Sequence, residues 1–197
     1  VKNRWHMFGS KAILDRLFHV IPFQFFGVKP VDYVLAMGNK YFRHGYPVNN
    51  KSKIIRGHFY DYGNYLMLKK ESSTYDQKRG VFLDEYLPYH CDNIDSGLPH
   101  VHAERYYSAL RTFFDKIERS SDIPIIIAAH PRSHYDKMPD VFGGRQVVRG
   151  RTAELVRDSS VVILHQSMSL NYAVMFRKPM IFVTTDEVNK YLIEDPS

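Results

Sequence analysis

Side chains that could bind or react follow four short apolar segments of this sequence. They are Asp84-Glu85, His130-Pro131-Arg132-Ser133, His165-Gln166-Ser167-Met168-Ser169 and Thr184-Thr185-Asp186-Glu187. If the apolar segments are parallel strands, their carboxyl ends meet at one edge of a sheet, where open α/β proteins bind ligands. Together the four groups predict one crevice that holds carboxylates, an imidazole and hydroxyls.

His130 is a candidate for phosphate binding, and it follows the most apolar of these segments, 124–129. Pro131 disfavours a helical conformation at His130, so the strand ends there and the imidazole leaves the sheet edge. A histidine can donate to a phosphate oxygen or act as an acid near neutral pH. Arg132 adds a permanent cation, and Ser133 completes this candidate set. The alternative is that His130 is an ordinary surface residue of a loop.

Ser167 and Ser169 stand where a predicted strand passes into a predicted helix, and both are candidates for phosphate binding. Hydroxyls and free backbone N–H groups at a helix N-terminus meet the positive end of the helix dipole. The competing interpretation is that one of the serines only caps the helix. Gln166 is also a candidate, because a glutamine at that position is not needed for capping.

Asp84 and Glu85 are the candidate catalytic carboxylates. Either could be a general base that activates an acceptor hydroxyl, or a nucleophile. The alternative is a solvated acidic pair at the start of a helix. Glu154 lies near the start of a predicted helix, where it would complement the helix dipole or hold ribose hydroxyls.

The spacing of apolar residues predicts regular alternation of strands and helices from position 80 onward. Predicted strands cover 31–37, 53–56, 81–83, 124–129, 146–148, 161–164 and 180–183. Predicted helices cover 11–21, 60–70, 102–119, 152–157, 169–176 and a segment that begins near 186. Continuous apolar strands between helices are typical of parallel sheets buried on both faces, so we predict a doubly wound α/β fold. The side chains expected to be almost fully buried are Ile125, Ile126, Ile127, Val162, Ile163, Ile181 and Phe182.

Composition narrows the classes of partner. The 197 residues carry a net charge of +6, which favours anionic ligands, although a basic surface without a specific ligand is the alternative. Basic residues are scattered rather than arranged in a stripe, so we expect no nucleic-acid partner. No apolar run is long enough to span a membrane, and the single cysteine fits a reducing cytoplasm. A Walker loop, a GxGxxG turn, a GxSxG elbow and zinc-ligand spacing are absent, so we expect neither a metal nor a cofactor.

The order of these motifs resembles bacterial GT-B glycosyltransferases that use CMP-activated acidic sugars, including sialyltransferases and Kdo transferases. In those families an acidic motif supplies the catalytic carboxylate, His-Pro and serine motifs contact the donor phosphate, and a glutamate binds ribose. The resemblance implies these roles for Asp84 or Glu85, with Asp84 favoured, for His130-Pro131, for Ser167 or Ser169, and for Glu154. The stretch 80–188 also resembles proteins of O-antigen and capsule clusters, in HPRS, RTAELV and SLNYAVMFRKPMIFVT. One departure is that the usual adjacent serine pair is Ser167-Met168-Ser169 here.

The resemblance also implies a domain organisation and a setting. Residues 1–70 would be the end of an incomplete acceptor-side domain, 71–79 a linker, and 80–197 the donor-nucleotide domain of a GT-B fold. The implied reaction moves a sugar from a CMP-linked nucleotide-sugar donor onto a growing surface polysaccharide, with a glycan or lipid-linked glycan as acceptor. The protein would act in the cytoplasm, in peripheral contact with the inner face of the plasma membrane. Two alternatives remain open: a CDP-polyol phosphotransferase of the teichoic-acid kind, and a non-catalytic nucleotide- or glycan-binding module.

Overall fold

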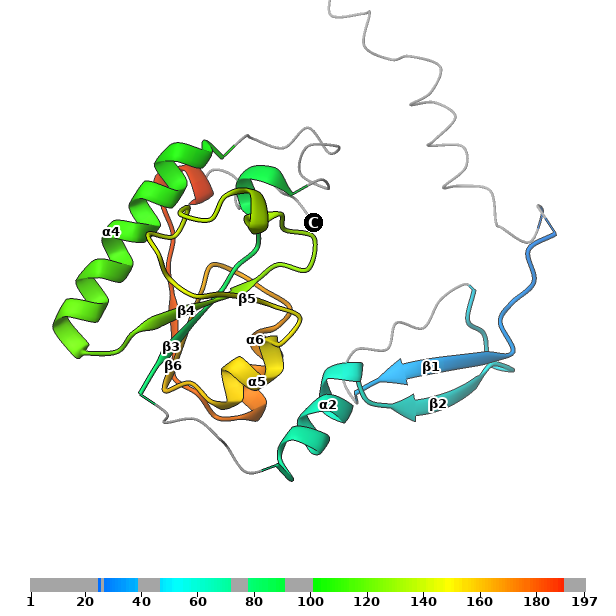
Figure 1. The fold of residues 1–197 in the computed structure, drawn as a ribbon. Helices are drawn as coiled ribbons and strands as arrows, with labels where there is room; N and C mark the ends of the chain where they lie inside the picture. Colours follow the sequence, from blue (N-terminus) through cyan, green and yellow to red (C-terminus); the bar gives the residue numbers. More distant parts are fainter. Residues whose placement is uncertain (1–24, 26, 39–46, 72–77, 91–100, 190–197) are drawn as a thin grey trace, which may run out of the picture. The chain divides into compact units, whose positions relative to one another are not determined.

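The computed structural model describes residues 25, 27–38, 47–71, 78–90 and 101–189, and the chain forms two units (Figure 1). The first unit ends at Phe59 and the second begins at Tyr60. The predicted helix 11–21 lies outside the described residues, as does 72–77, most of the predicted linker. The boundary between the units therefore lies ahead of the predicted domain end at 70, because the helix that begins at Tyr60 belongs to the second unit.

The described part of the first unit is a two-stranded parallel sheet. It pairs β1 (Tyr33–Met37) with β2 (Lys53–Gly57), so both strands lie where the sequence predicts strands. Ala36 is buried, whereas the larger apolar side chains of the pair, such as Leu35 and Ile55, are mostly exposed. Two strands alone bury too little apolar surface to be stable, so the described pair has no core of its own.

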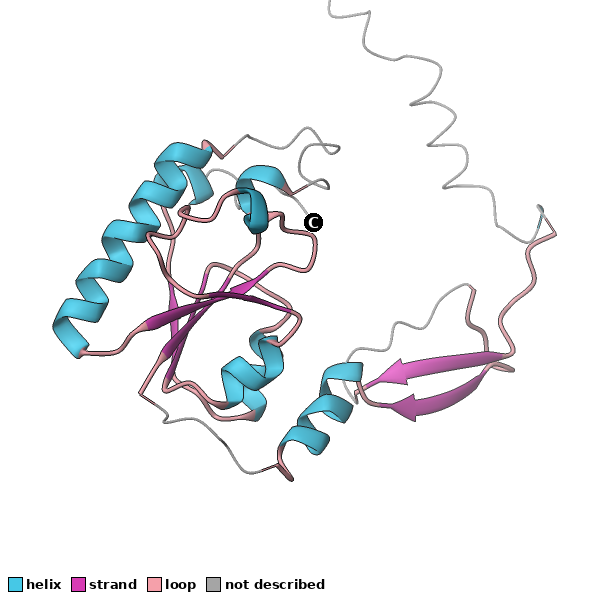
Figure 2. Ribbon diagram, viewed as in Figure 1, coloured by secondary structure: helices cyan, strands magenta, loops and turns pink. Residues whose placement is uncertain are grey.

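The second unit is built on a five-stranded parallel sheet in the order β5-β4-β3-β6-β7. Figure 2 draws its strands in magenta and the helices in cyan. Its strands are β3 (Gly80–Leu83), β4 (Ile125–Ala129), β5 (Val147–Arg149), β6 (Val161–Leu164) and β7 (Met180–Phe182). The chain begins at the centre with β3, moves outward through β4 and β5, and then crosses to the other side for β6 and β7. This order is that of a doubly wound, Rossmann-like sheet. The predicted α/β fold and the predicted parallel pairing of these strands are confirmed.

Helices cover both faces of this sheet (Figure 1). On one face lies α4 (Ala103–Ser121), whose buried side chains Tyr106, Leu110 and Phe114 recur at helical spacing. On the other lie α5 (Thr152–Arg157) and α6 (Leu170–Met175), and α2 (Tyr60–Leu68) contacts both of these short helices. Side chains of β3 alternate between the layers: Phe82 packs in the α4 cluster, and Val81 packs in the α5–α6 cluster.

The outermost strand β7 departs from the prediction. Ile181 and Phe182 were expected to be buried, but their side chains are 40% and 62% exposed, so that prediction is wrong. In the described part of the chain β7 pairs only with β6, which leaves it at the edge of the sheet. The same prediction is confirmed for the central strands, since Ile127 and Ile163 are fully buried.

Candidate functional site

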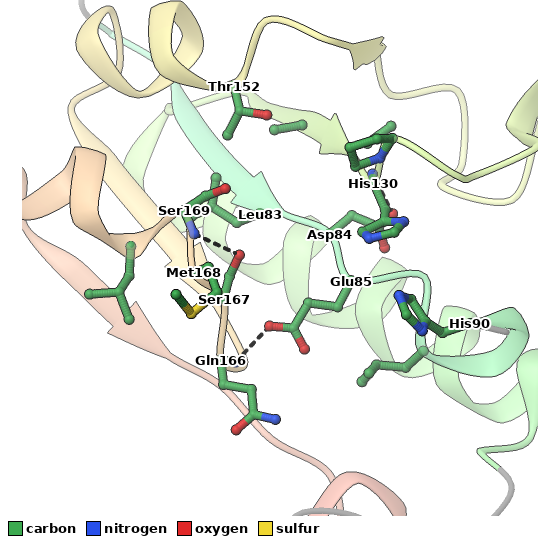
Figure 3. Close-up of a pocket in the computed structure, with 15 residues that line it drawn as sticks. Leu83, Asp84, Glu85, His90, His130, Thr152, Gln166, Ser167, Met168 and Ser169 are labelled. Carbon is green, nitrogen blue, oxygen red and sulfur yellow. Dashed lines mark hydrogen bonds between the residues drawn. The ribbon is translucent and has the colours of Figure 1, made fainter. Parts of the chain in front are cut away.

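The candidate site is a crevice at the carboxyl edge of the sheet, where β3 and β6 lie side by side. The connection from β3 includes α4 on one face of the sheet, and the connection from β6 includes α6 on the other. Because these two connections run to opposite faces of the sheet, a crevice opens between them, and ligands bind there in doubly wound folds. A cavity of about 620 Å³ occupies this position, which is within the usual size range of ligand pockets. The polar residues that line it are Asp84, Glu85, His90, His130, Thr152, Gln166, Ser167 and Ser169 (Figure 3).

Asp84 is buried at the end of β3, and protein donors hold both of its carboxylate oxygens. The backbone N–H of Tyr86 donates to Oδ1 at 3.1 Å, and the backbone N–H of His130 donates to Oδ2 at 3.2 Å. The hydroxyl of Tyr135 also donates to Oδ2, at 2.9 Å. The hydroxyl oxygen of Tyr107 lies 3.1 Å from the hydroxyl oxygen of Tyr135. Burial raises the pKa of Asp84 to about 6, although these hydrogen bonds act in the opposite direction. Asp84 therefore joins β3, the loop after β4 and η3 (Tyr135–Lys137) into one support.

Glu85 lies on the β6 side of the crevice. Its Oε1 accepts a hydrogen bond from the backbone N–H of Gln166 at 3.0 Å, as Figure 3 shows. The chain turns sharply after Glu85, because Tyr86 adopts a left-handed conformation with φ of 55°. Burial raises the pKa of Glu85 to about 8, and the neighbouring charge of Asp84 adds to the rise. The carboxyl of Glu85 is therefore mostly protonated at neutral pH and becomes ionised in mild base.

His130 leaves β4 as the sequence predicts, with Pro131 beside it in the lining of the crevice. Its Nδ1 atom accepts a hydrogen bond from the backbone N–H of Arg132 at 3.3 Å. An accepting Nδ1 carries no proton, so in the neutral ring the proton is on Nε2. His130 can therefore donate a hydrogen bond through Nε2 without becoming charged.

The loop between β6 and α6 brings Gln166, Ser167 and Ser169 to the crevice. The side chain of Ser169 makes no capping hydrogen bond to α6, so the simple capping interpretation does not hold for this serine. The hydroxyl oxygen of Ser167 instead accepts a hydrogen bond from the backbone N–H of Ser169 at 3.3 Å. Since α6 has only six residues, its dipole is a weaker source of anion binding than the sequence suggested.

Three of the candidate catalytic and donor-binding residues do not line the crevice, and neither does any residue of the predicted fourth group, 184–187. Ser133 is fully buried, and its hydroxyl donates to the backbone carbonyl of His130 at 2.7 Å, so it closes the turn instead of facing a ligand. The exposed side chain of Arg132 lies outside the lining. Glu154 also lies outside it and forms an ion pair with Arg151 at 3.7 Å.

Two lining residues, His90 and Thr152, were missed by the sequence-based prediction. Thr152 begins the predicted helix 152–157, so its position at a strand-to-helix connection was a usable signal. His90 follows the short helix η2 (Leu87–Tyr89) and had no such signal, because no strand or motif precedes it directly. The structure places its ring against that of His130, with the ring centroids 4.8 Å apart and the rings nearly perpendicular.

His165, which also follows β6, is a structural residue. One ring nitrogen, Nδ1, lies 2.7 Å from the backbone carbonyl oxygen of Val183, and the other, Nε2, lies 3.0 Å from the hydroxyl of Tyr106. A carbonyl oxygen can only accept, so Nδ1–H donates to it and Nε2 accepts from the tyrosine. Burial lowers the pKa of His165, which keeps the ring neutral. His165 therefore ties β6 to α4 and to the residue after β7.

No lysine or arginine is among the described residues that line the crevice. In the part of the chain that the structure describes, no three His, Cys, Asp or Glu side chains are grouped to hold a metal ion. Within the same residues, no helix has the length and apolar character needed to cross a membrane. The chain matches no model of a known protein family and no curated protein sequence.

Proposed function

We propose that this protein is a glycosyltransferase that takes its sugar from a nucleotide-linked donor. The crevice at the switch point of the sheet carries the proposal, because it joins two carboxylates, two imidazoles and three hydroxyls in one cavity of about 620 Å³. A nucleotide bound at the carboxyl edge of a Rossmann-like sheet would bring its phosphate to the loops after β4 and β6. The carboxylates after β3 would then lie beside the reacting sugar.

Glu85 is the better candidate for the catalytic base, although the sequence favours Asp84. Among the residues that the structure describes, both oxygens of Asp84 are engaged by protein donors, whereas Glu85 has a defined hydrogen bond at Oε1 alone, from Gln166. In the proposed reaction, ionised Glu85 removes the proton of an acceptor hydroxyl. The acceptor oxygen bonds to the anomeric carbon of the donor, and the bond from that carbon to the phosphate oxygen breaks. The phosphate leaves with the electron pair.

The polar groups that share the crevice with Glu85 suit a single phosphate. His130 can donate from a neutral ring, and Ser167 and Ser169 add hydroxyl donors. A diphosphate would bring more negative charge into a crevice whose described lining residues include no lysine or arginine. These features support a monophosphate-linked donor such as a CMP-sugar over a CDP-polyol. The resemblance of the motifs extends the proposal to an acidic sugar.

We extend the proposal to the setting that the resemblance implies. The second unit would be the donor-binding half of a GT-B fold, and the first unit would belong to the acceptor side. The acceptor would be a growing surface polysaccharide, presented at the inner face of the plasma membrane. The net charge of +6 supports contact with anionic lipid or glycan.

A ligand panel tests the proposal directly. Thermal unfolding is measured with CMP, CDP, UDP, GDP and ADP, and a ligand at one hundred times its dissociation constant stabilises a protein by about 2.7 kcal/mol. We expect CMP to give the largest stabilisation, and we expect release of CMP from a CMP-sugar when a glycan acceptor is added. If none of the five nucleotides stabilises the protein, the proposed function is wrong. If CMP binds but no sugar is transferred, the non-catalytic binding module becomes the better interpretation.

A further inference from the structure

His90 and His130 form a pair on one side of the crevice. Their rings meet edge to face with centroids 4.8 Å apart, and both residues line the cavity. In Figure 3 the pair lies on one side of Glu85, and the loop that contains Ser167 lies on the other. The two histidines come from different loops, after β3 and after β4, so the contact depends on the folded sheet and not on closeness in sequence.

The chemistry of the pair suits an oxyanion. The hydrogen bond from Arg132 to Nδ1 leaves the proton of His130 on Nε2, which makes His130 a directed donor. The Nδ1 atom of His90 is buried, so a ligand in the cavity would be bound through the other ring nitrogen, Nε2. The carboxylate of Asp84 accepts a hydrogen bond from the backbone N–H of His130.

A metal ion is a poorer match for this pair. Two histidines supply two ligands, and no third side chain in the described residues completes a group of metal-binding type. Phosphate oxygens instead accept hydrogen bonds from several donors at once. Such bonds are stronger where water is excluded, because the local dielectric constant is low.

We propose that His90, together with His130, donates a hydrogen bond from a ring nitrogen to the phosphate of the nucleotide-sugar. The proposal rests on the proposed function and assigns His90 a role in it. The two imidazoles grip one phosphate group from adjacent directions and stabilise the charge that gathers on it when the bond to the sugar breaks. The nucleoside part of the donor lies beyond their reach, so His90 affects the phosphate alone.

Calorimetric titration with CMP and with cytidine tests this assignment. His90→Phe keeps an aromatic ring against His130 but removes its nitrogens, and His90→Gln keeps a hydrogen-bond donor. We expect His90→Phe to weaken CMP binding about tenfold or more, the scale of a lost hydrogen bond to a charged group, and to leave cytidine binding unchanged. His90→Gln should lose less affinity for CMP than His90→Phe. His134→Ala, which removes an exposed histidine outside the cavity lining, is the matched control and should bind CMP as the original protein does.

The outcomes separate this inference from the proposed function. If His90→Phe binds CMP as tightly as the original protein, or loses CMP and cytidine binding equally, the assignment of His90 is wrong even when sugar transfer is observed. Inorganic phosphate provides the converse test, with the imidazole NMR signals of His90 and His130 followed during titration. Saturable shifts of both signals support the pair as an anion site even if no nucleotide binds, in which case only the proposed function fails. Absence of such shifts in the original protein, together with unaltered CMP binding by His90→Phe, overturns the assignment.

Discussion

The two sides of the central strand β3 differ in how they use polar groups. On the β4 side, Asp84 is buried and accepts hydrogen bonds from Tyr86, His130 and Tyr135. On the β6 side, Glu85 accepts a hydrogen bond from the backbone N–H of Gln166 and lines the crevice. Adjacent residues of the same chemical type therefore have different surroundings, because the parallel strands on either side of β3 end in different loops.

The comparison shows that the neighbours of a carboxylate at a strand end decide whether it holds the surrounding loops in place or can react with a ligand. A carboxylate with every oxygen bonded holds loops in place, and a change there is expected to act on stability. A carboxylate with an oxygen available to a ligand is expected to act on chemistry. The sheet shows the same contrast, since β4 is buried whereas β7, beyond β6, exposes its side chains.

The largest expected effect separates Glu85 from Asp84. Glu85→Gln should lower the rate of sugar transfer by about 100- to 10,000-fold, the usual contribution of a general base, while CMP binding stays nearly intact. Single-turnover transfer assays and calorimetry measure the two quantities. Asp84→Asn is the matched variant, and we expect it to lower the free energy of unfolding. If Asp84→Asn alone abolishes transfer in a fully folded protein, the roles of the two carboxylates are the reverse of those proposed.

The second prediction contrasts the strands on either side. Ile127→Ala in β4 removes a fully buried side chain and should lower the free energy of unfolding by about 2–5 kcal/mol through lost transfer energy and a cavity. Ile181→Ala in β7 removes the same atoms from a residue that is 40% exposed, and should cost about 1 kcal/mol or less. Urea denaturation measures both. Equal costs would show that β7 is covered in solution.

A smaller effect is expected at Tyr135, the side-chain donor to Asp84. Tyr135→Phe leaves one buried oxygen of Asp84 with fewer donors and removes the partner of the Tyr107 hydroxyl. We expect a loss of about 1–3 kcal/mol in the free energy of unfolding, measured by chemical denaturation. Tyr89→Phe, at a residue that is 40% exposed, is the control and should be nearly neutral. A neutral Tyr135→Phe would mean that Asp84 does not need this bond.

The smallest expected effect is on pH dependence. A base must be ionised, and burial raises the pKa of Glu85 to about 8, so kcat/KM should rise with pH and level off above that value. At pH 7 it should be about tenfold below the plateau, since one pH unit separates the two conditions. A rate that falls through pH 8 would instead identify Glu85 as an acid.

Stability should change with pH in the opposite direction. The folded-state pKa of Glu85 lies above its ordinary value of 4.5, so the folded protein binds more protons between pH 4.5 and about 8. This contribution to the free energy of unfolding is present in full below pH 4.5 and is lost as the pH rises to about 8. Glu85→Gln, followed by thermal unfolding across this range, should flatten that part of the profile.

The sequence was sufficient to predict the central strands of the sheet and their pairing. Parallel strands covered by helices on both faces need unbroken apolar runs, and 124–129 and 161–164 are such runs, so their type and pairing were predictable. The exposure of Ile181 and Phe182 was not predictable from the sequence, because an edge strand of this sheet has the same composition as a central one. Its position depends on how many strands follow on that side, which apolar spacing does not encode.

Part of the candidate site was also predictable from the sequence. Asp84, His130 and Ser167 follow strands whose carboxyl ends share one edge, so strand direction alone brings them together. The direction of each side chain depends on the turn that follows the strand. Ser133 faces inward because its hydroxyl closes the turn after His130, and His90 reaches the crevice only because the chain reverses after Glu85.

That reversal depends on Tyr86, and it has a consequence for the kinetics of binding. A left-handed conformation costs a residue with a side chain about 1–2 kcal/mol, which here is offset by the bond to Asp84 and by packing of the Tyr86 ring against Tyr135. The turn is therefore set when the protein folds, and Glu85 is in position before any ligand arrives. Association of a nucleotide should accordingly follow a single exponential whose rate rises linearly with nucleotide concentration, without a slower step for ordering this loop.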